Sequence, residues 1–277
     1  MDPASIVGMI GAISAVVAML YMEGASITAI LLPPPMVLVF GGTLLATLAS
    51  YTMRDAAHAW SSVPKALTAK VPDSTASIDT IVSLSEKARR EGLLALEDAA
   101  KGIEDPFMRE GLMGAIDGMD PEDLRSLLTD KMEAKKASDK TAYAWFHAAG
   151  GYAPTIGIIG TVVSLVHVLT NLSNPETLGP MIASAFVATL WGLLSANMLW
   201  LPMSSRMERI SNLELARMEI VTEGLISLQS GANPRQVGER LRSLIPPNQI
   251  KKSKEEVAAK RERYQPGQRD QGNLLNP

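Results

Sequence analysis

Residues 148–170 read AAGGYAPTIGIIGTVVSLVHVLT, and residues 179–202 read GPMIASAFVATLWGLLSANMLWLP. Neither segment contains Asp, Glu, Lys or Arg, and each is long enough to cross a bilayer as a helix. The connection between them, residues 171–178, is short and polar, so the two helices are expected to be antiparallel neighbours. Thr161 and Thr189 then lie at a similar depth, roughly 15 Å from the outer end of the hairpin at ~1.5 Å per residue.

Two further apolar segments precede this hairpin. No charged residue lies between Asp2 and Glu23 or between Glu23 and Arg54, so residues 4–22 and about 31–52 are predicted to form the first two of four membrane spans. The second begins at a triple proline, and its helix should start within or after these prolines because proline cannot lie inside a helix without breaking it. The predicted fold is an all-α membrane protein with four transmembrane helices and a helical cytoplasmic domain inserted between helices two and three.

Basic residues lie on one side of the predicted spans. They are Arg54, Lys65, Lys70, Lys131, Lys135, Lys136, Lys140, Arg206 and Arg209. The two short loops on the other side carry only Glu23 and Glu176 as charged residues. By the positive-inside rule, both termini and the long middle segment are expected to be cytoplasmic.

The charge map divides the chain into regions. We expect membrane helices one and two in residues 1–52, a cytoplasmic helical domain in 53–147, the ion-pathway hairpin in 148–202, C-terminal cytoplasmic helices in 203–249, and a disordered polar tail in 250–277. Within the middle domain, Ile81, Leu84 and Ala88 recur at helical spacing, and Asp120 precedes a proline that suits a first helical turn.

The composition limits the chemistry of the chain. It has no Cys, so it has no disulfide, thiolate metal ligand or thiol nucleophile, and its net charge of −3 gives no reason to expect nucleic acid as a partner. An intramembrane enzyme would need paired acids, a nucleophile with its base, or a metal cluster, whereas the hairpin offers only Ser164 and His167. The sequence therefore predicts no enzyme and no permanently bound metal.

Small residues recur three and four positions apart on both hairpin segments. They are Gly150, Ala153, Gly157, Gly160, Thr161 and Ser164 on the first, and Ala185, Thr189, Gly192 and Ala196 on the second. One interpretation is close helix packing, with the threonine hydroxyls bonded to their own helix. The other is a polar pathway, because hydroxyl oxygens can accept a hydrogen bond from water or coordinate a hard cation.

Two prolines flank this stripe. Pro154 and Pro202 lack a backbone N–H, so each frees a carbonyl one turn earlier for water, an ion or a moving helix; a simple kink or helix end is the alternative. Proton or sodium coupling normally needs a group that loses its charge, and the apolar segments of the hairpin contain no carboxylate. If this chain moves ions, the carboxylate must come from another chain.

Several strings resemble one family. They are Ala153 to Thr161 (APTIGIIGT), Gly179-Pro180-Met181, Ala188 to Gly192 (ATLWG), Ser195 to Met198 (SANM) before Pro202, Ala88 to Glu97 (ARREGLLALE), and Gly231 to Arg235 (GANPR). Together they are similar to the flagellar motor stator A subunit, the MotA/PomA family within the MotA/TolQ/ExbB superfamily. The resemblance extends in order from residue 1 to about residue 247.

The resemblance implies an assembly in the bacterial inner membrane. Five copies of this subunit would surround two copies of a B subunit of the MotB/PomB type, whose membrane helix supplies the ion-binding Asp. Ion binding and release there would turn the A ring and drive the rotor. Pro154 and Pro202 match the family's functional prolines, and Thr189 matches its pathway threonine. Arg89 and Glu97 match the charged residues that meet the rotor protein FliG, and Arg90 lies beside Arg89. No cofactor is implied, only transported Na⁺ or H⁺.

The identity of the ion follows from a few positions. Sodium-type relatives carry Thr where this chain has Thr161, and a second oxygen near Thr189 suits a dehydrated cation. Thr155, which we also place on the pathway, and His167 resemble residues of proton-type members. We therefore favour sodium, with protons as the alternative. Two other functions stay open: an ExbB/TolQ-like energiser of envelope transport, whose members have three spans, and a non-conducting membrane scaffold.

Overall fold

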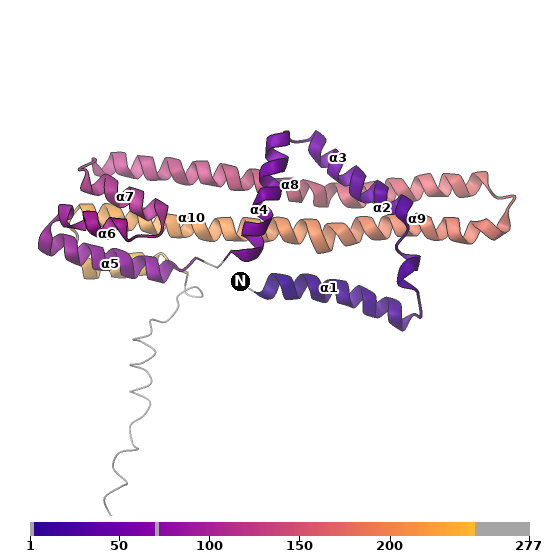
Figure 1. The fold of residues 1–277 in the computed structure, drawn as a ribbon, viewed down its shortest axis with the longest axis horizontal. Helices are drawn as coiled ribbons and strands as arrows, with labels where there is room; N and C mark the ends of the chain where they lie inside the picture. The colour runs from indigo at the N-terminus through magenta and orange to yellow at the C-terminus, as the bar shows by residue number, and fades with distance from the viewer. Residues whose placement is uncertain (1–2, 70–71, 247–277) are drawn as a thin grey trace, which may run out of the picture. The chain divides into compact units, whose positions relative to one another are not determined.

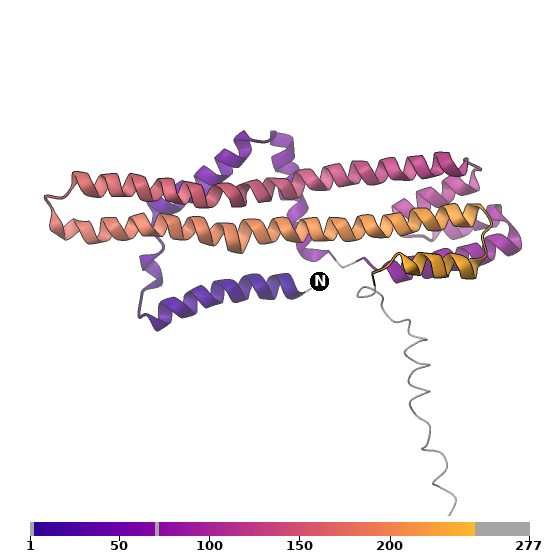
Figure 2. The ribbon, with the colours of Figure 1, turned by 180° about the vertical axis from the view of Figure 1, so that it is seen from behind.

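The computed structural model describes residues 3–69 and 72–246, and of residues 3–6 only the backbone. All regular structure in these ranges is helical, as the sequence predicted (Figures 1 and 2). The predicted polar tail, residues 250–277, lies outside the described residues.

The helices follow one another with short connections. In chain order they are α1 (Pro3–Met22), η1 (Ile27–Ala29), α2 (Pro33–Met36), η2 (Val37–Gly41), α3 (Gly42–Ala49), α4 (Met53–Thr68), α5 (Ser74–Glu91), η3 (Leu93–Leu96), α6 (Glu97–Lys101), α7 (Pro106–Ile116), α8 (Pro121–Thr170), α9 (Pro175–Ser195), η4 (Ala196–Trp200), α10 (Leu201–Gln229) and α11 (Pro234–Ser243). The elements η1 and η3 are 3₁₀ turns, whereas η2 and η4 are π-helical turns.

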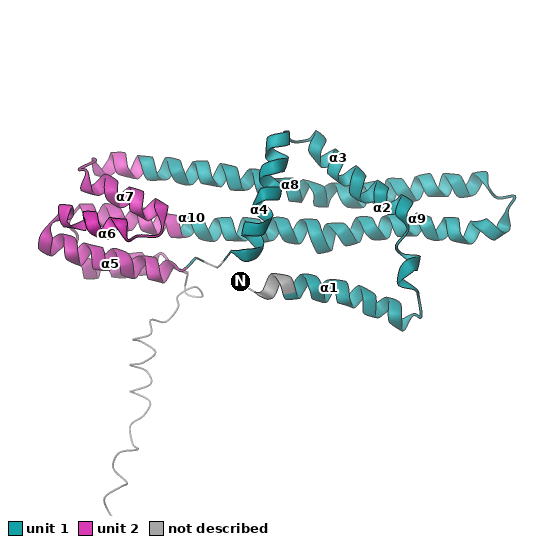
Figure 3. Cartoon of the chain, in the orientation of Figure 1, with its two compact units in different colours: residues 1–72, 127–216 teal, residues 73–126, 217–277 magenta. Residues whose placement is uncertain are grey.

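The chain forms two compact units (Figure 3). The first unit comprises residues 1–72 and 127–216, and the second comprises residues 73–126 and 217–277. The domain boundaries predicted after residues 147 and 202 fall inside α8 and α10, which continue through them without a break. The positions at which these helices leave the membrane therefore stay predictions.

The apolar segments coincide with the predicted spans. Helical segments Pro121–Thr170 and Pro175–Gln229 are long and apolar enough to cross a membrane, and the shorter segments Val7–Met22 and Pro33–Ala49 are also apolar. The second span starts at the first of its three prolines, because a proline at the first helical position loses no intrahelical hydrogen bond.

The hairpin turn is shorter than predicted. Helix α9 already begins at Pro175, so the connection ends at Asn174 rather than at residue 178. The prediction treated this proline as a loop residue, yet its fixed backbone angle suits the first turn of a helix. Helices α8 and α9 run antiparallel, as expected (Figures 1 and 2).

Helices α8 and α9 approach each other through glycine. A Cβ atom on Gly157 would lie 2.8 Å from the backbone oxygen of Ala188, and one on Gly192 would lie 2.7 Å from that of Ala153. A Cβ atom on Gly160 would lie 2.9 Å from the Cβ of Ala188. These distances leave no room for a side chain, so the small-residue stripe includes the packing surface of the hairpin.

An aromatic cluster ties α4 to this hairpin. Trp145, Phe146 and Trp200 are only 2–3% exposed, and the ring of Trp60 from α4 lies 5.6 Å from the rings of Trp145 and Phe146. Both contacts are edge-on, which is an arrangement that aromatic quadrupoles favour.

A half-buried lysine joins α8 to α10 in the same unit. Lys135 on α8 pairs with Asp139 and with Glu214 on α10, each at 2.7 Å. Burial opposes the charge on Lys135, but these two carboxylates raise its pKa. The lysine therefore stays charged at neutral pH and holds the two helices together.

The second unit has a separate apolar core held by ion pairs. Its fully buried side chains include Ile81, Leu96, Leu112, Leu225 and Leu241. Around this core Arg217 pairs with Asp105 at 2.5 Å, and Arg125 pairs with Glu223. The hydrogen bond from Arg125 lowers the pKa of Glu223, so that carboxylate stays ionised at neutral pH.

Replacing Gly192 with Ala should destabilise the hairpin by about 1–3 kcal/mol, because the new methyl group would collide with backbone rather than with a movable side chain. The measurement is the thermal unfolding midpoint of the detergent-purified protein. The matched control is Gly179→Ala on the same helix, where no atom lies within 4 Å of the added Cβ, and its midpoint should not fall. Equal midpoints for the two variants would contradict a close backbone contact at Gly192.

Candidate ion-pathway site

Two threonine hydroxyls meet across the hairpin. The Oγ1 atoms of Thr161 on α8 and Thr189 on α9 are 2.5 Å apart, and both side chains are half-buried. Thr161 also lies 2.9 Å from the backbone oxygen of Ala185 and 3.2 Å from that of Gly157. The structure thus joins the two residues that sequence analysis placed at the same depth.

The hydrogen atoms of this pair determine what its oxygens can accept. Each hydroxyl has one hydrogen and two acceptor lone pairs. Thr161 can donate to the carbonyl of Ala185, in which case Thr189 donates to the oxygen of Thr161. The Thr189 oxygen then keeps both lone pairs, which can accept a hydrogen bond from water or bind a cation.

The glycine contacts fix the pair in place. A Cβ atom on Gly157 would lie 3.2 Å from the Cα of Thr189, so the threonines lie next to the closest approach of the two helices. The glycines of the stripe therefore make the packing contact, and the two hydroxyls lie beside it; the polar pathway stays a prediction.

Thr155 is not part of this pair. Its hydroxyl donates to the backbone oxygen of Tyr152 at 2.8 Å, and its side chain is exposed. Within the described ranges it has no hydrogen bond to either of the other two pathway threonines. His167 is also exposed, and its ring lies 3.5 Å from the amide nitrogen of Asn171 in the hairpin turn.

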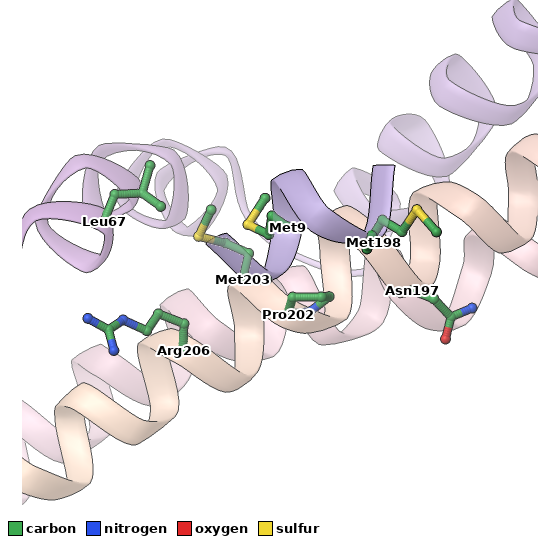
Figure 4. A pocket seen from close by; sticks show the side chains of 9 residues that line it. Met9, Leu67, Asn197, Met198, Pro202, Met203 and Arg206 are labelled. Carbon is green, nitrogen blue, oxygen red and sulfur yellow. The ribbon is translucent and has the colours of Figure 1, made fainter. Parts of the chain in front are cut away.

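The two prolines occupy different surroundings. Pro154 lies inside α8 beside the hairpin contact, since a Cβ atom on Gly192 would be 3.3 Å from its Cα. Pro202 is the second residue of α10, just after the π-helical turn η4, and the N–H of Leu201 between them bonds to the oxygen of Ala196. Pro202 also lines a cavity of about 230 Å³ (Figure 4). π-Helical turns are often found at functional positions of helices.

The three predicted rotor-contact residues lie in the second unit. Arg89 and Arg90 are in the last turn of α5, and Glu97 is the first residue of α6. All three are exposed. Glu97 lies 3.8 Å from Lys101 on its own helix, a weak surface pair. Gly92, with a φ of 85°, makes the turn between the end of α5 and the start of α6, so the three residues are close in the sequence.

Sequence analysis did not single out two polar side chains of the membrane segments. The indole nitrogen of Trp191 donates to the backbone oxygen of Ile30 at 2.6 Å, which ties α9 to the turn between the first two spans. Thr43 on α3 is fully buried, and its hydroxyl oxygen has no hydrogen-bond partner among the described residues. Trp191 belongs to the ATLWG string, but no pattern in the sequence identifies its acceptor.

The described residues include no group of three or more His, Asp or Glu side chains that could hold a metal ion. The hydroxyl pair is a polar contact between the two helices and brings no charge of its own.

Comparison with known proteins identifies the family. Residues 6–92 match the model of the motility protein A N-terminal family, and residues 99–220 match that of the MotA/TolQ/ExbB proton channel family. Motility protein A of Bacillus subtilis (strain 168) is 31% identical over 251 residues, which cover 89% of this chain and 92% of that protein. Chemotaxis protein PomA of Vibrio alginolyticus is 30% identical over 245 residues, which cover 88% and 96% of the two chains.

A solved structure agrees with these matches. The chain in the structure of the flagellar MotAB stator complex from Bacillus subtilis superposes with a TM-score of 0.82 at 29% identity, and the match covers 89% of this chain and 97% of that one. This likeness and the apolar helices confirm the predicted all-α membrane fold. The chain belongs to the MotA/TolQ/ExbB proton channel family, and within it to the group of motility protein A.

Proposed function

We propose that this chain works with a B subunit of the MotB/PomB type as an ion-driven stator that turns the flagellar rotor. Its relatives include motility protein A and a chain from a MotAB stator complex, which support this role. The observation that carries the proposal is the Thr161–Thr189 hydroxyl pair, held at 2.5 Å in a hairpin whose apolar segments contain no carboxylate.

The missing carboxylate defines the partner. A charged group at the bilayer centre costs about 2.5–3.5 kcal/mol on insertion scales, and it is retained where it has a function. In our proposal the membrane helix of the B subunit supplies an Asp beside the threonine pair. A ring of five A subunits around two B subunits would let one Asp meet successive threonine pairs as the ring turns.

We favour sodium as the coupling ion. Two hydroxyl oxygens at one depth can replace part of the hydration shell of a cation, whereas a proton needs no such oxygen ligands. Protons remain the alternative, since Thr155 and His167 resemble residues of proton-type members. No other cofactor is needed.

The prolines would link ion binding to movement. Pro154 lies at the packing contact of α8 with α9, and Pro202 follows a π-helical turn, so both occupy places where a helix can bend without losing a complete hydrogen-bonded turn. Bending there would transmit a change at the hydroxyl pair along α8 and α10, the helices that each extend into both units.

The basic residues give the orientation. In our proposal the chain is a multi-pass protein of the bacterial inner membrane, with both termini and the second unit in the cytoplasm, where the rotor lies. Arg89, Arg90 and Glu97 would then meet FliG. Their exposure supports this role, because a charge available to a partner must not be buried in its own unit.

Two alternatives are weaker. An ExbB/TolQ-like energiser would share the model matched by residues 99–220, but the motility protein A model matched by residues 6–92 covers both predicted spans that precede the inserted helices. A passive scaffold would explain the glycine contacts at Gly157 and Gly192. In such a scaffold, however, the hydroxyl pair would have no role other than helix packing.

Replacing Thr189 with Val keeps the side-chain shape and removes the hydroxyl. In cells that lack their own stators and receive this chain with its B subunit, the variant should assemble but drive swimming at least about tenfold more slowly, because a lost bond to a charged group costs about 1.5–3 kcal/mol. Thr177→Val on the same helix is the control and should swim normally. Lost assembly, or unchanged speed, would support the scaffold instead.

Replacing Arg89 with Glu should stop swimming while leaving assembly and ion flow intact, because it reverses a charge offered to the rotor. A compensating charge reversal on the facing surface of FliG should restore motion. The control is Arg235→Glu, which alters another exposed arginine, one that pairs with Glu239 on its own helix. If the Arg89 variant swims as fast as this control, Arg89 does not contact the rotor.

A further inference from the structure

One large apolar side chain stands out on the surface of the second unit. Among the described residues of that unit, the exposed large hydrophobic side chains are Leu94 in η3, at 77% exposure, and Leu244 after α11, at 47%. The neighbouring leucines of η3 are covered: Leu93 is half-buried and Leu96 is fully buried. A single exposed leucine is common on protein surfaces, so the meaning of Leu94 depends on its setting.

The backbone holds Leu94 outward. Gly92, with a φ of 85°, has a conformation that other residues rarely adopt, and it turns the chain from α5 into η3. Leu96 then anchors the turn in the core, and η3 packs against α5 and α7. The direction of the Leu94 side chain is therefore set before any partner arrives, which lowers the entropy lost on binding.

Leu94 lies in the chain between charges of opposite sign. Arg89 and Arg90 precede it, and neither forms an ion pair with a described residue. Glu97 follows it and lies 3.8 Å from Lys101. Basic residues at a helix end and acidic residues at a helix start occur in many helices, so the charges alone identify no partner. An apolar centre with a charged rim, however, is the usual anatomy of a protein–protein contact.

We propose that Leu94 is the apolar anchor of the surface that contacts the rotor. This inference rests on the proposed function, in which Arg89 and Glu97 meet FliG. The partner surface would carry an apolar pocket for Leu94, with acidic groups facing Arg89 and Arg90 and a basic group facing Glu97. Burial of the leucine side chain would supply affinity, whereas the charges steer and orient the two surfaces.

The first test uses the substitution Leu94→p-benzoyl-phenylalanine, which introduces a photo-crosslinking side chain. The full chain is expressed with its B subunit in cells that lack their own stators, and illumination should give a covalent adduct with FliG. The same amino acid in place of Leu244 is the control and should give no such adduct, because that leucine lies outside the proposed contact. An adduct between two copies of this chain from position 94, with none to FliG, would overturn the proposal.

A second test measures the affinity of the detergent-purified complex with its B subunit for purified FliG. Leu94→Ser should lower this affinity about tenfold, because it removes the apolar anchor. Leu94→Met keeps an apolar side chain of similar size and should retain most of the affinity, and Leu244→Ser should bind as the wild type does. All three variants should assemble and keep the wild-type unfolding midpoint, since exposed side chains contribute little to the stability of the fold.

The results separate this proposal from the one on which it rests. If the wild-type complex binds FliG and Leu94→Ser binds equally well, Leu94 is not the anchor, whereas the rotor contact itself stands. Equal losses in Leu94→Ser and Leu94→Met would also overturn an apolar anchor. If the wild-type complex neither binds FliG nor drives swimming, the proposed function and the anchor are both wrong.

Discussion

The backbone contact between α8 and α9 at Gly157 and Gly192 sets the geometry of the first unit. Each glycine leaves less than 3 Å between a notional Cβ atom and a carbonyl oxygen of the other helix, so neither position accepts a side chain. This approach brings the hydroxyls of Thr161 and Thr189 within hydrogen-bond distance. With larger residues the helices would separate, and the two hydroxyls would lose their hydrogen bond.

The exclusion of charge from the two apolar segments of the hairpin is central to the proposed function. These segments carry hydroxyls and no carboxylate, so in our proposal the charged group of the site comes from elsewhere. The proposed division of labour gives the A chain the polar, neutral part of the site and the B chain the charged part. Movement of one chain past the other can then follow the charge state of a single Asp.

The sequence predicted the fold well because its strongest signals are local. Long uncharged runs, a triple proline and an Asp-Pro helix start determine where helices lie and begin, independently of their neighbours. The pairing of Thr161 with Thr189 was also predictable, since a short hairpin turn fixes the register of its two helices. The predicted turn was too long, because Pro175 was placed in the connection rather than at the first position of the helix.

Other features depended on contacts that no local pattern encodes. The bond from Trp191 to Ile30 and the cavity that residues of α1 and η4 line together each involve segments far apart in the chain. The two π-helical turns were also unexpected: a proline predicts a disturbed helix, but whether it becomes a kink, an end or a π turn depends on packing. The roles assigned to Pro154, Pro202, Arg89 and Glu97 rest on resemblance, and they stay predictions.

The most direct test of the central claim is swimming speed against external sodium, at fixed pH and membrane potential, in stator-less cells that express this chain with its B subunit. If the threonine pair helps to bind a sodium ion, speed rises and saturates with sodium, and Thr161→Ala shifts the half-saturating concentration upward. Speed that is indifferent to sodium but collapses when a protonophore is added would contradict a sodium site at Thr161 and Thr189.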